Sequence, residues 1–306
     1  MIRTHLKYLS ILYVSFISLT GCINYTTTND EGLESYESNK EVVNEEKFPL
    51  TSGYVDFRSG RKLAEICDTI QKENNLLQTV NRNNGFTTCY GDSNLHIIEY
   101  LGYEIVFNSL LKIPVLVKYE LTAEEVDGIF SRKGLDFCED SKACVDQAND
   151  YDYRGSGWSR GHMAPAGDFT WSSKALRETF YYTNCCPQDL TLNTGQWKYL
   201  EEEVRDWAKR FCRIDVVTGP IVGNNEYGTI GYNKVVIPDA FYKAIYNGEQ
   251  AIAFVMYNRP KNKSMKNCAM SVDCLEELSG WDFFPELDDE IENKVEATYV
   301  LNHWNL

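Results

Sequence analysis

The sequence of 306 residues has little positive charge: 30 Lys and Arg residues face 45 Asp and Glu residues, which gives a formal charge of −15 at pH 7. A protein that binds phosphate chains over its whole surface needs the opposite balance, because such binding scales with the cations brought to the phosphates. The composition therefore excludes a uniformly basic surface. A polyanion would need a local cationic cleft.

Several other features are missing. There is no run of about 20 apolar residues that would make a membrane-spanning helix, and we find no internal repeat. With 43% hydrophobic and 25% charged residues, the chain is neither collagen-like nor wholly disordered. A zinc site is not expected, because the sequence has no Cys-x-x-Cys pair and its histidines are scattered. They are His5, His96, His162 and His303.

Cysteine, by contrast, is abundant. Ten cysteines in one chain favour an exported protein with some disulfide bonds. Cys138/Cys144 and Cys268/Cys274 each enclose a short loop and are candidate pairs, with Cys67/Cys89 as a third. We expect Cys185 and Cys186 to point to opposite faces of an extended segment and Cys212 to be a buried free thiol.

The N-terminus also indicates export. Arg3 and Lys7 precede twelve apolar residues, 8–19, and Leu19-Thr-Gly-Cys22 then resembles a bacterial lipoprotein cleavage site. Cleavage before Cys22 removes 21 of the 306 residues, including both cations, and leaves 285 residues with a formal charge of −17. We expect a lipid on Cys22 to anchor the protein to a bacterial membrane, facing the periplasm or the cell surface.

The remaining chain divides in two. Residues 22–50 are acidic and have little apolar periodicity, which is typical of a solvated tether, and residues 51–306 are predicted to form one domain. Short apolar segments without regular crossover helices predict an α+β fold with a mostly antiparallel sheet flanked by helices. The predicted strands are 95–107, 113–121, 214–219, 234–238, 241–246 and 250–257. One helix is predicted to begin at Thr122, which has a capping box. Three more helices are predicted at 199–211, 274–280 and 288–296.

Candidate functional residues concentrate between residues 151 and 205. Four glycines surround Arg160-Gly-His162, where positive φ angles can bring a His and an Arg together at a turn. Asn193 follows 31 residues later, and the strongest predicted helix then carries Glu201. Each residue alone is more commonly structural: a His beside Gly is usually a turn residue, and a loop Asn is usually a cap.

Together the motifs resemble the DNA/RNA non-specific endonucleases of the ββα-metal group. That family reads Asp-Arg-Gly-His, Asn-x-x-Pro-Gln and Asn-x-Gly-x-Trp-x-x-Leu-Glu. This chain has Ser159-Arg-Gly-His162, Asn184-Cys-Cys-Pro-Gln188 and Asn193-Thr-Gly-Gln-Trp-Lys-Tyr-Leu-Glu201 with the same spacings. Further similarity extends over about residues 95–295, so the resemblance implies a ββα-metal nuclease fold and hydrolysis of phosphodiester bonds in DNA and RNA.

The resemblance also assigns roles. It implies that His162, with a pKa near the usual value of about 6.5, is the general base and that the Asn193 amide oxygen holds a single Mg²⁺, for which Mn²⁺ or Ca²⁺ are substitutes. Glu201 would orient water at the metal, Arg160 would lie near the phosphate, and Arg132 would stabilise the transition state. Asn184 is a supporting amide, and no small-molecule cofactor is implied.

One position departs from the family. Ser159 replaces the family Asp and brings no charge. Asp168 could partly compensate, although a structural turn role fits it better. If the missing carboxylate is needed, the protein is instead a weak or inactive nuclease-fold lipoprotein that captures nucleic acid.

A third alternative is a hydrolase with a Ser or Cys nucleophile. It is weak because no sequence motif supplies a catalytic partner for Ser156.

Charge near these motifs differs from the chain average. Residues 152–213 hold nine Lys and Arg against eight Asp and Glu, a balance of +1. We expect contacts to the nucleic-acid backbone from Arg154, Lys174, Arg177 and Lys198. Such contacts carry no sequence information, so cleavage should be non-specific and sensitive to salt.

Overall fold

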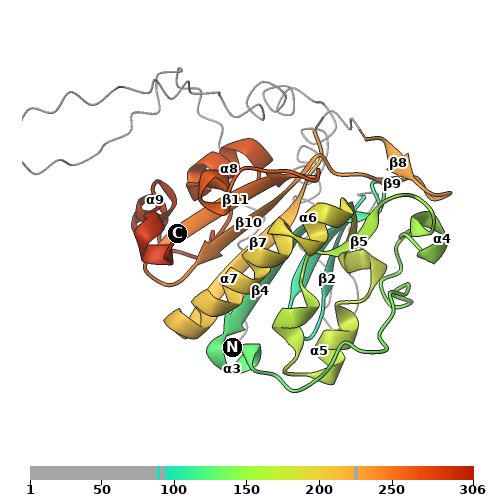
Figure 1. Ribbon diagram of the computed structural model, residues 1–306, viewed down its shortest axis with the longest axis horizontal. Coiled ribbons are helices and arrows are strands. Elements are labelled where there is room, and N and C mark those ends of the chain that lie inside the picture. Colours follow the sequence, from blue (N-terminus) through green and yellow to red (C-terminus); the bar gives the residue numbers. More distant parts are fainter. Residues whose placement is uncertain (1–87, 90–93, 224–226) are drawn as a thin grey trace, which may run out of the picture.

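The computed structural model describes residues 88–89, 94–223 and 227–306 (Figure 1). The predicted signal segment with Cys22, the tether and the first part of the predicted domain lie outside the described residues. Within the described ranges, no helix has both the length and the apolar character that a membrane crossing requires.

One eight-stranded sheet organises the described chain, in the order β1-β2-β3-β4-β7-β10-β11-β12 (Figure 1). Every neighbouring pair in it is antiparallel, which confirms the predicted α+β class. The strands are β1 (Thr88–Cys89), β2 (Leu95–Glu99), β3 (Glu104–Asn108), β4 (Ile113–Thr122), β7 (Arg213–Ile221), β10 (Ala240–Tyr246), β11 (Ala251–Tyr257) and β12 (Ala269–Met270).

Two predicted strands were wrong in their extent. Residues 95–107 form a hairpin of β2 and β3, because the chain turns at Gly102, where an added Cβ would lie 2.8 Å from the Phe169 ring. Residues 234–238 contribute only β9 (Val235–Val236), which pairs with β8 (Thr229–Ile230), because Lys234 has a φ of 59° and starts no extended run.

Helices α3, α7, α8 and α9 follow the four predicted segments within a few residues, whereas α4, α5 and α6 were not predicted. Thr122 caps α3 (Ala123–Val126) with Glu125 in the expected capping box. The others are α4 (Asp150–Tyr153), α5 (Ser173–Glu178), α6 (Leu190–Thr194), α7 (Gln196–Phe211), α8 (Val272–Ser279) and α9 (Asp289–Glu296), with 3-10 turns η1 (Ala166–Phe169), η2 (Tyr182–Asn184), η3 (Met265–Cys268) and η4 (Leu301–Trp304).

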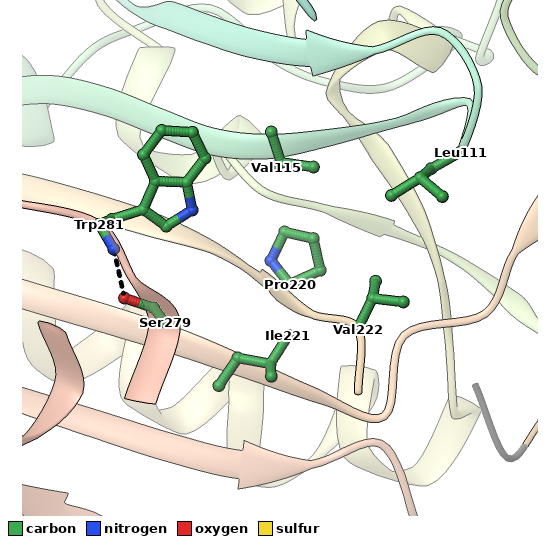
Figure 2. Close-up of a pocket in the computed structure, with 7 residues that line it drawn as sticks. All are labelled: Leu111, Val115, Pro220, Ile221, Val222, Ser279 and Trp281. Atoms are coloured by element: carbon green, nitrogen blue, oxygen red, sulfur yellow. Dashed lines mark hydrogen bonds between the residues drawn. The ribbon is translucent and has the colours of Figure 1, made fainter. Parts of the chain in front are cut away.

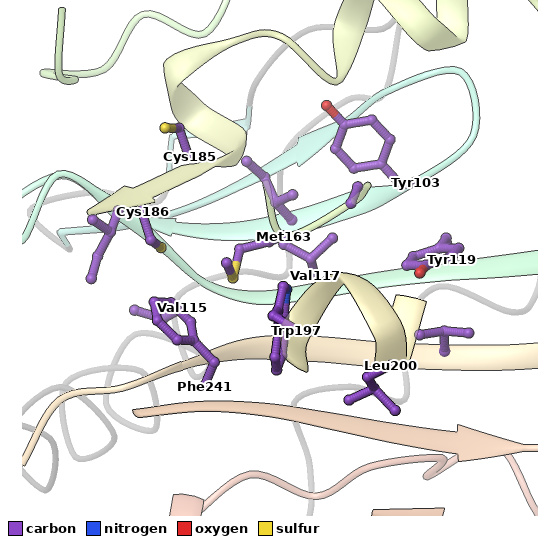
Figure 3. Close-up of a cluster of buried hydrophobic side chains, with 14 of the residues drawn as sticks. Tyr103, Val115, Val117, Tyr119, Met163, Cys185, Cys186, Trp197, Leu200 and Phe241 are labelled. Atoms are coloured by element: carbon purple, nitrogen blue, oxygen red, sulfur yellow. The ribbon is translucent and has the colours of Figure 1, made fainter. Parts of the chain in front are cut away.

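The sheet has a different cover on each face, as alternate residues of β10 show. Phe241 and Ile245 pack in the core with Trp197 and Leu200 of α7, and Figure 3 shows part of this cluster. Tyr242, between them in the strand, packs instead in the core of α8 and α9. Successive strand side chains point to opposite faces, so helix α7 and the pair α8/α9 lie on opposite sides of one sheet.

The cysteines differ from expectation. Cys138, Cys144, Cys268 and Cys274 are all free thiols, so the two local pairs predicted among them do not form. Cys138 instead accepts a hydrogen bond from Arg177, at 3.0 Å, and Cys144 lies in a turn with a φ of 51°. Cys212 is free but exposed rather than buried, because it ends α7 with a φ of 68°. Cys67 lies outside the described residues.

Candidate active site

Two short strands and a following helix form the frame of the site. Strand β5 (Ser159–His162) pairs antiparallel with β6 (Cys185–Gln188), and helices α6 and α7 follow β6. Gly155 and Gly157, with φ of 73° and 84°, turn the chain into β5. A Cβ on Gly161 would lie 2.3 Å from the Gln188 side chain, so the close approach of the two strands requires glycine there.

His162 projects from β5 between two aromatic rings. Its ring centre is 4.6 Å from that of Phe137 and 4.9 Å from that of Phe180. The nitrogen Nε2 is buried and has no hydrogen-bond partner among the described residues. Burial, followed by the positive charge of Arg132, lowers the pKa of His162 to about 3. This pKa is lower than the expected value near 6.5, and the imidazole is neutral throughout the physiological range.

Arg132 lies on the exposed loop before Phe137. Its guanidinium carbon is 5.6 Å from the centre of the Phe180 ring, which also borders His162. The structure therefore brings Arg132 to His162 over a separation of 30 residues. A cation at this position can approach a phosphate without an acidic partner, because no ion pair of Arg132 occurs in the described chain.

Arg160 is partly buried, and neighbouring side chains hold its guanidinium. Its guanidinium donates to the Asp150 carboxylate at 2.5 Å and to the Tyr182 hydroxyl at 3.1 Å, and it lies 5.1 Å from the centre of the Tyr153 ring. Asp150 also pairs with Arg154 at 2.5 Å. To contact a phosphate, the Arg160 guanidinium must either keep only part of its interaction with Asp150 or break that ion pair.

Ser159 and Asn193 are joined by a short chain of hydrogen bonds. The Asn193 amide nitrogen Nδ2 donates to Ser159 Oγ at 3.0 Å and to the Arg160 carbonyl at 3.4 Å, and Ser159 Oγ donates to the Gln188 carbonyl at 2.6 Å. Both acceptors of Nδ2 are oxygens, so the orientation of the amide is fixed. Its oxygen Oδ1 receives no hydrogen bond from the described residues.

A single amide oxygen of this kind fits the metal that the fold family implies. Mg²⁺ prefers oxygen ligands, keeps several waters and uses few protein groups. Asn193 Oδ1 would supply one such ligand, because the hydrogen bond from Nδ2 to Ser159 fixes the amide with its oxygen free. The donor set therefore fits a hard divalent cation even though Ser159 lacks the family carboxylate.

The sequence Gly157-x-Ser159-x-Gly161 also has the spacing of a hydrolase nucleophile elbow, in which Ser lies on a sharp turn between a strand and a helix. Here Ser159 lies within β5, and its hydroxyl is used in hydrogen bonds to Gln188 and Asn193. The geometry does not support a serine nucleophile.

Glu201 lies on helix α7, close enough to Lys243 for the charge of the lysine to act on it. Burial raises the pKa of Glu201 to about 7, Lys243 and Arg205 oppose the shift, and Asp168 adds to it. Lys243 is completely buried, and its Nζ lies 5.1 Å from the centre of the Trp197 ring without a hydrogen-bond partner in the described chain. Burial lowers the pKa of Lys243, while the Glu201 and Asp168 carboxylates act in the opposite direction.

Asp168 and Asn184, both expected to support the site, are fully buried. Asp168 accepts hydrogen bonds from Arg205 at 2.9 Å and from Tyr119 at 2.8 Å, which ties η1 to α7 and β4. Asn184 Oδ1 accepts from the Ala164 amide at 2.8 Å, and Nδ2 donates to two carbonyls. Both residues hold the backbone around His162, and neither has an atom left to replace the family carboxylate.

The four expected backbone cations lie on the surface in local contacts. Arg154 pairs with Asp150, Lys174 with Glu178 at 3.6 Å, and Lys198 with Glu202 at 3.4 Å. Arg177 donates to the Asp136 carbonyl and to Cys138. Such exposed pairs contribute little stability and separate readily.

Sequence reasoning missed Lys243, Asp150, Phe137 and Phe180. A lysine inside the apolar run 240–246 was the signal for Lys243, since charged residues are rarely fully buried without a partner. Asp150 lies on α4, ten residues before Arg160, and Phe137 and Phe180 lie 25 and 18 residues from His162, so no short motif links them.

An apolar pocket lies elsewhere and does not contribute to this chemistry. Figure 2 shows that Val115, Pro220, Ile221 and Trp281 border it, and Trp281 donates its backbone NH to Ser279 at 3.2 Å. None of the predicted site residues lines it.

Comparisons with known proteins agree with these motifs. Nuclease EXOG, mitochondrial, of Xenopus laevis is 34% identical over 209 residues, covering 62% of this chain and 58% of the relative. This chain thus matches less than two thirds of that protein's length. Endonuclease G, mitochondrial, of Homo sapiens is 30% identical over 202 residues, covering 60% of this chain and 68% of the relative.

The fold agrees as well. A solved structure of the EndoG/EndoGI complex has a TM-score of 0.59 at 29% identity, covering 64% of this chain and 88% of that chain. The family model for DNA/RNA non-specific endonucleases matches residues 80–290. The chain therefore belongs to the DNA/RNA non-specific endonuclease family.

Proposed function

We propose that this protein is a metal-dependent endonuclease that hydrolyses phosphodiester bonds in DNA and RNA without sequence preference. The observation that carries the proposal is the fixed amide of Asn193 on helix α6: its oxygen has no hydrogen bond from the described residues, and its nitrogen donates to Ser159 and Arg160 of the strand that carries the neutral His162. When bound there, a divalent cation such as Mg²⁺ would polarise the phosphate and neutralise developing charge.

The chain's own residues supply the remaining steps. The imidazole of His162 accepts the proton of the attacking water, for which it must be neutral, and its burial keeps it neutral. Arg132 stabilises the charge that builds on the phosphate oxygens. Asn193 and Glu201 are the candidates to hold the cation and its waters, and Lys243 favours the charged form of Glu201.

The test is digestion of supercoiled plasmid and single-stranded RNA by the full chain, with Mg²⁺ or with EDTA. We expect cleavage of both substrates in Mg²⁺ and about a 10³-fold loss for His162→Ala. The matched control is His303→Gln, far along the chain, where Nε2 contacts Asn247 Nδ2 at 2.7 Å. Equal digestion by His162→Ala would contradict the assigned base, and binding without cleavage in any divalent cation would favour nucleic-acid capture instead.

We further propose that the protein is exported and held to a bacterial membrane by a lipid on Cys22. The residues 19–22 and the preceding apolar run support this. In bacterial cells, wild-type protein should partition into the detergent phase and Cys22→Ser should not, while Cys212→Ser serves as the control. Equal partitioning of wild type and Cys22→Ser would contradict the anchor.

A further inference from the structure

Three carboxylates gather where α8 meets α9. Asp273 and Glu276 lie one turn apart on α8, and Glu296 ends α9. One oxygen from each lies within 4.8 Å of the other two. These helices cover the sheet face opposite to α7, so the group is separate from the Asn193 region.

One carboxylate oxygen of this group is buried and has no hydrogen-bond donor among the described residues. Glu296 is 3% exposed, and its Oε1 has no hydrogen-bond partner among the residues that the structure describes. Glu276 accepts a single backbone hydrogen bond, from Phe283 at 2.7 Å. None of the three carboxylates forms an ion pair within the described ranges.

The surrounding charges make the burial less favourable. Burial raises the pKa of Glu296 to about 9, and the groups that raise it further are all carboxylates, including Glu276 and Glu292. Burial likewise raises the pKa of Glu276 to about 7, and Asp282 and Asp273 add to the effect. A buried negative charge of this kind needs either protons or a cation.

The geometry favours a cation. Calcium binds carboxylate oxygens at about 2.3 to 2.6 Å, so two oxygens on opposite sides of one ion are about 5 Å apart. Oxygens within 4.8 Å of one another therefore fit around a single ion. Asp273 is exposed, which leaves one side of the site open to water ligands and to entry of the ion.

We propose that Asp273, Glu276 and Glu296 bind a divalent cation of the calcium type that fastens α9 to α8. The site is structural and does not depend on the proposed nuclease activity. Its ligands come from the last two α-helices of the chain, and binding stabilises their packing against β11.

The first test is thermal unfolding of the full chain in calcium chloride and in EDTA. We expect saturating calcium to raise the Tm by about 5 °C or more, because an ion that binds only the folded state stabilises it. Glu296→Gln, which keeps the shape of the side chain, should abolish this rise. Glu290→Gln, which removes an exposed charge from the same helix, should retain it.

A second measurement reports the site directly. Terbium, which replaces calcium, should give emission sensitised by Trp281, two residues before Phe283, and calcium should displace it. Glu296→Gln should lose the signal, while Asn193→Ala should keep both the signal and the calcium response. An equal Tm in calcium and EDTA, or an equal calcium rise in Glu296→Gln, would overturn the proposal. A Tm that rises on acidification but not in calcium would show that the three carboxylates bind protons and not a cation.

Discussion

Two groups of buried carboxylates lie on opposite faces of the central sheet, and their surroundings differ. On the α7 face, Asp168 pairs with Arg205, and Glu201 lies within the field of Lys243. On the α8/α9 face, Glu276 and Glu296 are acted on by other carboxylates. Cations within the protein therefore offset the carboxylates on the α7 face, whereas only carboxylates act on Glu296 on the other face, which is where we propose the calcium-type site.

Removing the internal cation of the α7 face should have a large effect, second only to the loss of His162. We expect Lys243→Met to lower nuclease activity at pH 7 by about 100-fold, because Glu201 loses the charge that opposes its raised pKa and stays protonated. Activity should recover at higher pH. The pH profile of kcat/KM tests this, and an unshifted profile would show that Lys243 has only a packing role. Glu201→Gln should be insensitive to the same pH change.

His162 should make folding stability pH-dependent. Its pKa is about 3 in the folded protein and about 6.5 when unfolded, so only the unfolded state takes up the proton as the pH falls between these values. At pH 5 this costs about 2 kcal/mol of unfolding free energy relative to pH 8. In urea unfolding, His162→Gln should therefore lose less unfolding free energy on acidification than the wild-type protein does. Parallel curves for both proteins would contradict the low pKa.

Substitution of Ser159 tests whether a hydrogen bond, in place of the family carboxylate, positions Asn193 as the proposed metal ligand. Ser159→Ala removes the acceptor for Asn193 Nδ2, and we expect about a 10-fold weaker apparent affinity for Mg²⁺. Titration of activity with Mg²⁺ measures it, and activity at saturating Mg²⁺ should largely return. Ser159→Thr, which keeps the hydroxyl, is the control. A fall in kcat without a change in Mg²⁺ dependence would count against the positioning role.

Glu296 in EDTA should show the opposite pH dependence to His162. Its pKa is raised in the folded state, so the stability present below the unfolded pKa is lost as the pH rises toward about 9. Glu296→Gln should remove this loss, which is about 4 kcal/mol between pH 5 and pH 8 for a carboxyl group with an unfolded pKa of about 4.3. Chemical unfolding at pH 5 and pH 8 measures the difference. A variant that is less stable at both pH values would show that the carboxylate is already compensated.

The elements with strong local signals were predictable. The amphipathic stripe of α7 and the Thr122 capping box appear as expected, because periodicity and capping depend on residues a few positions apart. The hairpin within residues 95–107 was missed, because its turn depends on Gly102 lying against the distant Phe169 ring. The two disulfide predictions among the described residues were wrong for a related reason, since short spacing between cysteines does not determine where each thiol points.

Residue types at fixed spacings identify the family, the α+β class and the order of the motifs that bear His162, Asn193 and Glu201. Which charges come near one another depends on the tertiary structure. The fold brings Lys243 close enough to act on the charge of Glu201, pairs Arg160 with Asp150, and gathers carboxylates where α8 meets α9. Electrostatic interaction depends on distance and burial, and both are determined only when segments far apart in the chain pack together.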